Sequence, residues 1–318
     1  NFNQNIELRD CNEIFKIKKI ITDIENANSK KTQEKLENII SNIKNKIKAL
    51  YNNEEIELKS YYKPKKLNYE DYRELKIHNN LVDEIALNAI TLIFIDSLRT
   101  LISNNSNCGN ILDTFESKNF FLPYFLQYKK FIGKRFEYIN NNRFNYLSVF
   151  DIKKFYDRIN FDKIKEILLE HFDNNNSDVM ETIGIYEKLC ANGLPQGPVF
   201  SHFFATLILY DLRDKFLEKF PTFEIIYYVD DINVFFNSID SDESNKIDEK
   251  IKNFLIEYLK PKFIENNELE VLNIEKHQII PIAERDNISN IILQLSAIDE
   301  FRKDDSKKMD SFERETLS

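Results

Sequence analysis

The side chains best suited to chemistry in this sequence are acids that end apolar segments. The segment Tyr228–Asp231 lies between two runs of β-branched and aromatic residues, 223–227 and 232–236, which predicts a β-hairpin with Asp230 and Asp231 at its turn. Asp is a common turn residue, so these two acids alone also fit a solvated hairpin tip. A third acid, Asp151, ends another apolar run that begins at Tyr146. Two elements that each deliver a carboxylate favour a functional site.

Carboxylates that are brought together require a cation between them. Each ionised acid is disfavoured by its neighbours unless positive charge intervenes. Mg²⁺ suits the place, because it binds one or two carboxylates together with substrate phosphates; Mn²⁺ is the alternative. Two such ions roughly 3.5–4 Å apart activate an attacking hydroxyl and stabilise a leaving pyrophosphate oxygen. The acids therefore predict two-metal phosphoryl transfer, in which positioning and charge neutralisation do most of the catalysis.

A loop rich in Gly and Pro lies between the acidic segments. The chain has five Gly and seven Pro, and two of each fall between Gly193 and Pro198. Glycine permits close approach of the backbone to another molecule, which is one explanation for this concentration. An ordinary loop before a buried helix is the other.

Three segments, in order, resemble motifs A, B and C of reverse transcriptases. They are Asp-Ile-Lys-Lys-Phe-Tyr-Asp-Arg-Ile from Asp151, Gly-Leu-Pro-Gln-Gly-Pro from Gly193 with Ser201, and Tyr-Val-Asp-Asp from Tyr228. The segment 272–277 resembles motif D. The resemblance covers residues 145–282 and extends more faintly over 60–144.

The motif B segment bears on the subtype. Retron and group II intron enzymes usually carry a small residue after Pro-Gln-Gly and a Pro after the motif B Ser, where this chain has Pro198 and His202. The segment looks more like the defence-associated abortive-infection (AbiA-like) group. That resemblance implies DNA synthesis, templated or untemplated, in defence against phage. A templated retron-type or intron-type enzyme is one alternative. A weakly active palm that senses nucleotides or nucleic acid for an attached effector is another.

The resemblance assigns roles around the acids. It implies that Asp151 and Asp230 are the principal metal ligands, that the Ile152 carbonyl adds a backbone oxygen, and that Asp231 binds more weakly or from further out. Tyr156 lies where the family has its aromatic gate against a ribose 2′-hydroxyl, which implies use of deoxynucleotides. The alternative for Tyr156 is a core aromatic at the start of a helix.

Further positions are implied in nucleotide binding. Gln196 and Gly197 are expected to line the incoming nucleotide and template. Lys276 is expected to protonate the leaving pyrophosphate or to bind phosphate, and a surface lysine is the alternative. Arg73, with Lys76 as its substitute, is the candidate to grip the triphosphate, because guanidinium reads phosphate bidentately; a surface role is the alternative. The segment 72–78 resembles the family's fingers strand, and the apolar periodic stretch 81–102 resembles the long helix that follows it.

The resemblance also predicts the architecture. We expect an α+β fold with right-hand polymerase fingers and palm, an antiparallel palm sheet and N-terminal helices, with a thumb absent or outside this chain. The expected parts are an N-terminal helical extension (1–66), fingers (67–145), a palm (146–283) and a C-terminal segment or linker (284–318). A helical domain that acts as thumb or effector is expected to follow in a longer protein.

Composition limits the remaining possibilities. The net charge of −9 requires local basic patches for any contact with nucleic acid, and 129–135 is one candidate. Three scattered cysteines predict no disulfide framework and fit a reducing cytoplasm. The apolar run 85–102 is expected to be too short for a membrane span. The expected partners are dNTPs and nucleic acid, with an RNA or protein primer and a homo-oligomer left open.

Overall fold

The computed structural model describes residues 30–64, 72–102, 106–112, 120–173, 176–264 and 270–282. Contacts divide the chain into two compact units, of which the first contains residues 1–100 and 156–207 and the second contains 101–155 and 208–318. Helices combine with antiparallel sheets, so the predicted α+β fold class is confirmed. The expected C-terminal segment (284–318) and the first 29 residues of the N-terminal extension lie outside the described residues.

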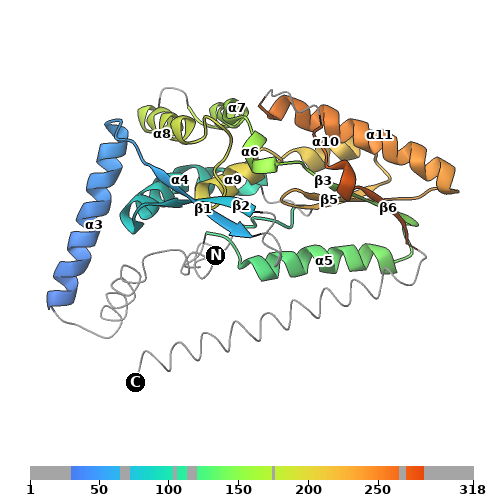
Figure 1. Cartoon of the computed structure of the whole chain (residues 1–318), viewed down its shortest axis with the longest axis horizontal. Helices are drawn as coiled ribbons and strands as arrows, with labels where there is room; N and C mark the ends of the chain where they lie inside the picture. Colours follow the sequence, from blue (N-terminus) through green and yellow to red (C-terminus); the bar gives the residue numbers. More distant parts are fainter. Residues whose placement is uncertain are drawn as a thin grey trace, which may run out of the picture. The chain divides into compact units, whose positions relative to one another are not determined.

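The first unit combines a two-stranded sheet with helices (Figure 1). Its elements are α3 (Lys30–Tyr51), β1 (Leu58–Pro64), β2 (Tyr72–His78), α4 (Leu81–Ile102, which ends in the second unit), α6 (Phe155–Arg158, which begins there), α7 (Phe161–His171), α8 (Ser177–Leu189) and α9 (Val199–Leu207). The strand expected over 72–78 is present, and it pairs with β1. Strand β1, which includes the exposed Lys59 and Tyr62, forms the other strand of that hairpin.

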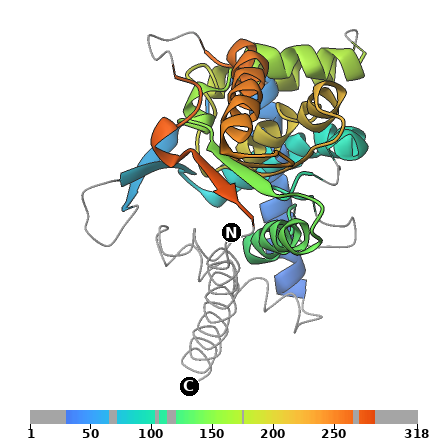
Figure 2. The same cartoon turned by 90° about the vertical axis from the view of Figure 1, so that its right-hand side faces the viewer.

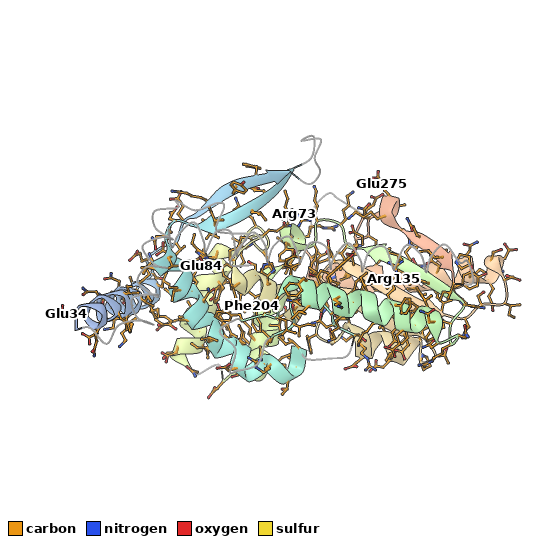
Figure 3. The ribbon with its side chains drawn as sticks, turned by 90° about the horizontal axis from the view of Figure 1, so that it is seen from below. Glu34, Arg73, Glu84, Arg135, Phe204 and Glu275 are labelled. Carbon is orange, nitrogen blue, oxygen red and sulfur yellow. The ribbon has the colours of Figure 1, made fainter. Side chains whose placement is uncertain are left out.

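Aromatic side chains fill the core of the first unit. Tyr186 of α8 is fully buried, and its hydroxyl donates to the Leu87 carbonyl of α4 at 2.9 Å. Phe94, Phe200 and Phe204 surround the same ring, and Figure 3 labels Phe204. Such aromatic contacts bury large areas and favour edge or tilted geometries.

Helix α4 corrects one expectation. It has 22 residues, and an 18-residue window within it reaches a mean hydropathy of 1.7, so its length and composition do meet those of a membrane span. The run 85–102 was expected to be too short for a membrane span. This was wrong because the helix is longer than the run and begins at Leu81. Many of its side chains, including Leu87 and Phe94, are buried, and a core helix passes the same test.

The second unit is built on a four-stranded antiparallel sheet of order β4-β5-β3-β6. Its elements are α5 (Tyr124–Asn140), β3 (Tyr146–Asp151), α10 (Leu212–Lys219), β4 (Glu224–Tyr228), β5 (Asp231–Phe236), α11 (Ser241–Leu259), the 3₁₀ turns η1 (Lys260–Lys262) and η2 (Ile274–Lys276), and β6 (Gln278–Pro281). Helix α5 lies along one face of the sheet, and α10 and α11 cover the other (Figures 1 and 2).

The two faces of this sheet have different cores. On the α5 face, Phe131 and Ile132 of the helix pack with Leu147, Ile226 and Phe235 of the strands. Strand side chains alternate between faces, so β3 directs Ser148 and Phe150 towards α11. This alternation fixes which polar groups near the strand ends share a face.

Candidate active site

Two of the predicted acids face each other across neighbouring strands. Strands β3 and β5 pair antiparallel, and the register places Asp151 directly opposite Asp231. Asp151 follows Leu147 by four residues and Asp231 precedes Phe235 by four, so both acids lie on the α5 face. The Asp151 side chain is only 7% exposed. The predicted hairpin is therefore present, and the second acidic strand lies beside it.

The turn of the hairpin consists of Val229 and Asp230. The Asp230 carbonyl accepts a hydrogen bond from the Ile152 N–H at 2.9 Å, which ties the turn to the end of β3. Val229 has φ 58°, a left-handed conformation that a β-branched residue rarely adopts. Such a residue costs about 1–3 kcal/mol and persists only where the surroundings enforce it.

A segment before α5 provides that enforcement. The Cys108 N–H donates to the Tyr227 carbonyl at 2.8 Å, and the Tyr227 N–H donates to Ser106 at 3.0 Å, so the segment pairs with the edge of β4. A Cβ on Gly109 would meet the Val229 nitrogen at 2.7 Å. Glycine thus allows the segment to press directly on the turn.

Helix α5 supports the hairpin from the same face. Tyr128 contacts the Tyr228 ring edge-on at 5.4 Å between centroids, and Phe131 contacts it at 5.8 Å. Arg135, labelled in Figure 3, interacts electrostatically with Asp231. Burial lowers the pKa of Arg135, an effect that the charges of Tyr128 and Asp231 oppose. The basic segment 129–135 therefore brings a cation towards the acidic cluster and uses its aromatic residues for packing.

A lysine already neutralises one of the acids. Lys276 Nζ lies 2.6 Å from Asp151 Oδ2, in an ion pair between residues 125 apart in sequence. Burial opposes the charged ammonium, but the hydrogen bond and the charge of Asp151 outweigh it and raise the pKa of Lys276. Its side chain is 61% exposed, so it can leave without opening the core. The Lys276 ammonium therefore stands in for a cation at Asp151.

The acids are close enough to perturb one another. Burial, followed by the negative charges of Asp230 and Asp151, raises the pKa of Asp231 to about 6. Among the described residues, no group of three or more His, Cys, Asp and Glu side chains is arranged so that it could hold a metal ion. The donor chemistry nevertheless fits a hard divalent cation, because the facing carboxylates share excess negative charge.

The other predicted site residues lie in the first unit. The Gln196 carbonyl accepts a hydrogen bond from the Lys76 N–H at 2.6 Å. Gly197 has φ 127°, and a Cβ there would meet the Lys76 carbonyl oxygen at 2.5 Å. The loop glycines therefore approach the chain's own backbone, rather than only another molecule. Arg73 lies on β2, three residues before Lys76. Figure 3 labels its position on the β1–β2 hairpin.

Tyr156 contacts His202 of helix α9, which belongs to the same unit. Its hydroxyl lies 2.8 Å from His202 Nδ1, and the two rings meet edge-on. Burial lowers the pKa of His202 to about 4, so the imidazole is neutral at physiological pH. Tyr156 is 9% exposed.

Sequence reasoning missed several residues that organise the site. Gly109 was given no role, and His277 entered only as the last residue of the segment that resembles motif D. Asp248, buried in α11, contacts both Ser148 and His277. The signal for Asp248 was a lone acid on the inner face of an amphipathic helix, where a buried charge requires a partner.

A four-stranded antiparallel sheet with an acid pair at adjacent strand ends and helices on both faces is consistent with the palm of a polymerase. Residues 103–261, half of the chain, match the family described as Reverse transcriptase (RNA-dependent DNA polymerase). The chain belongs to this family. A search of curated proteins found no match.

Solved structures of telomerase are similar to this chain. Apo telomerase from Candida tropicalis, truncated from its C-terminal domain, is 17% identical with a TM-score of 0.44, over 70% of this chain and 49% of that one. Telomerase from Candida albicans, in complex with a TWJ fragment of telomeric RNA, is 13% identical with a TM-score of 0.45, over 70% and 42%. The chain thus spans less than half the length of these telomerase chains. The family assignment rests on the family match.

Proposed function

We propose that this chain catalyses DNA synthesis from deoxynucleoside triphosphates with a divalent metal, using Asp151, Asp230 and Asp231. The observation that carries the proposal is the register of β3 and β5, which sets Asp151 opposite Asp231 beside the Asp230 turn. Carboxylates that repel one another in this way favour cation binding. A structural role alone does not require three acids at one sheet edge.

The residues of the second unit have distinct proposed roles. The three carboxylates and the Ile152 carbonyl would hold two Mg²⁺ ions, with Mn²⁺ as substitute. When bound, such ions activate the attacking 3′-hydroxyl and stabilise the leaving pyrophosphate. The exposed Lys276 side chain would turn from Asp151 towards the leaving phosphates, to which its ammonium would donate.

The first unit is proposed to select the nucleotide. Tyr156 would exclude a ribose 2′-hydroxyl, and Gln196 and Gly197 would contact nucleotide and template. Arg73 would bind the triphosphate. Support comes from motif position and from the hydrogen bond that fixes the Tyr156 ring against His202.

The proposed setting is abortive-infection defence against phage in the cytoplasm. Support comes from Gly-Leu-Pro-Gln-Gly-Pro followed by His202, which departs from the retron and intron pattern. In this setting the proposed synthesis is templated or untemplated, and an RNA or protein group is the proposed primer. Templated synthesis by a retron-type or intron-type enzyme is the alternative within the same chemistry.

One observation favours a second function. Lys276 Nζ forms an ion pair with Asp151 Oδ2 at 2.6 Å. The same ion pair is expected in a palm that binds nucleotides without a catalytic metal. Such a palm would sense nucleotides or nucleic acid for an attached effector.

The test is synthesis by the complete protein. Labelled deoxynucleotides or ribonucleotides are supplied with Mg²⁺, with and without template, to the parent and to Asp230→Ala. We expect deoxynucleotide incorporation that is abolished in Asp230→Ala. Equal synthesis by both proteins refutes the catalytic role of the acids. Triphosphate binding by a parent that makes no DNA supports the sensing function.

A further inference from the structure

His277 lies beside Lys276 and is bound at both ring nitrogens. Nδ1 lies 3.0 Å from the Val149 carbonyl oxygen, and Nε2 lies 2.9 Å from Asp248 Oδ2. The ring stacks on Phe150 with centroids 4.7 Å apart and planes at 18°. Strand β3 and helix α11 therefore fix its position and orientation together.

These contacts determine how many protons the ring carries. A carbonyl only accepts hydrogen bonds, so Nδ1 must donate to Val149. The Asp248 carboxylate also accepts, because Ser148 Oγ donates to its other oxygen. Imidazole binds a proton more readily than a carboxylate, so the proton between Nε2 and Asp248 belongs to the ring. These contacts therefore favour the imidazolium, in which both N–H groups donate hydrogen bonds.

The side chains of His277 and Lys276 lie on opposite faces of the sheet. Ser148 and Phe150 face α11, and His277 joins them there with Asp248. Asp151 faces α5, and Lys276 reaches it from the preceding position of the chain. The backbone passes between the two side chains, so fixing one limits the movement of the other. The Asn273 N–H also donates to the Asp151 carbonyl at 2.8 Å, which holds the start of the same turn.

We propose that His277 is a positioning residue that, as an imidazolium clamped by Asp248 and Val149, holds Lys276 at the catalytic acid Asp151. The clamp uses a charge-assisted hydrogen bond to a buried carboxylate, which is stronger than a neutral one. Within the described residues, the charged groups that face the ring are Asp248 and Lys252, both from α11. The hydrogen bond from Asp248 raises the pKa of His277 against burial and the charge of Lys252.

The charge state is tested by nuclear magnetic resonance on the complete protein with labelled histidine. His277→Gln identifies the signal. We expect His277 to titrate above its ordinary pKa of about 6.5, to titrate lower in Asp248→Asn, and to titrate higher in Lys252→Gln, which removes a like charge from a half-buried position. An ordinary or lower value that is insensitive to Asp248→Asn overturns the clamp.

The positioning role is tested by the reactivity of Lys276, a readout that does not need activity. Acetylation of Lys276 by an amine reagent, followed by peptide mass spectrometry, should be faster in His277→Gln than in the parent, because the ion pair is loosened. Exposed Lys250 serves as internal reference and should react at an unchanged rate. Equal rates at Lys276 in both proteins overturn the role, even if the chain makes no DNA.

The consequence for catalysis rests on the proposed function and is measured separately. His277→Gln should lower kcat for deoxynucleotide incorporation by roughly tenfold or more, since small misplacements of catalytic groups have such effects. In a Lys276→Ala background the same substitution should change kcat little, because contacting residues that act together are not additive. A full additional loss in the double variant means that His277 only supports the fold.

Discussion

Gly109→Ala tests whether the segment before α5 holds the Val229–Asp230 turn in place. The added Cβ would lie 2.7 Å from the Val229 nitrogen and 2.8 Å from its Cγ2, against 3.4 Å or more for ordinary contacts. The turn or the segment must therefore shift by about 0.7 Å. Gly109 does not have a left-handed φ, so the cost arises from this collision and not from its own backbone.

The magnitude follows from two opposing effects. Overpacking of this kind costs about 1–3 kcal/mol, and replacing Gly by Ala recovers about 0.4–1 kcal/mol through the unfolded chain. We expect a net loss of about 1–2 kcal/mol of the free energy of unfolding. A shift of 0.7 Å also exceeds the tolerance of about 0.5 Å for catalytic groups, so kcat should fall roughly 10- to 100-fold.

Gly133→Ala is the matched control. Gly133 lies in the middle of α5, and a Cβ there meets nothing within 4 Å. The same chemical change should therefore stabilise the chain by about 0.5–1 kcal/mol and leave kcat unchanged. Thermal unfolding and deoxynucleotide incorporation are measured for both variants. If Gly109→Ala matches Gly133→Ala in both measurements, the segment does not brace the turn.

Three other predictions concern the charged groups and the gate. Lys276→Ala should raise the affinity of the metal site for Mn²⁺, measured by electron paramagnetic resonance, because it removes the cation paired with Asp151; unchanged or weaker binding contradicts the ion pair. The raised pKa of His277 contributes stability that is complete below about pH 6.5 and is lost as pH rises through the folded-state pKa. The thermal stability of the parent relative to His277→Gln should therefore shrink between pH 6 and 9, and a constant difference refutes this. Tyr156→Ala should increase ribonucleotide incorporation relative to deoxynucleotide incorporation in a competition assay, and an unchanged ratio removes the gate.

The sequence allowed the acidic strands to be predicted because local pattern and chemistry agree there. Buried β-branched and aromatic runs form strands, and an acid that ends such a run must lie at the sheet's edge. The family resemblance, together with apolar periodicity, predicted a strand over 72–78 and a helix over 81–102, which correspond to β2 and α4. Strand β1 was not predicted, because exposed Tyr and Lys side chains show no buried face.

Contacts between distant residues could not be predicted in this way. Asp151 and Lys276 are 125 residues apart, and Ser148 and Asp248 are 100 apart. The sequence indicates that a buried Asp248 needs a partner, but not which one. Gly109 likewise shows its purpose only when Val229 lies against it. The register also places Asp231 opposite Asp151, whereas motif reasoning gave Asp231 an outer position; which acid binds metal most strongly stays a prediction.

The most direct test of the account is metal binding by the acids themselves. Mn²⁺ binding to the complete protein is measured by electron paramagnetic resonance, with Mg²⁺ as competitor, for the parent, Asp230→Asn and Asp214→Asn. Asp214, with a side chain 75% exposed on α10, controls for the loss of one negative charge. We predict saturable binding, displaced by Mg²⁺, in the parent and Asp214→Asn, and its loss in Asp230→Asn. Equal Mn²⁺ affinity in all three proteins would contradict the central claim.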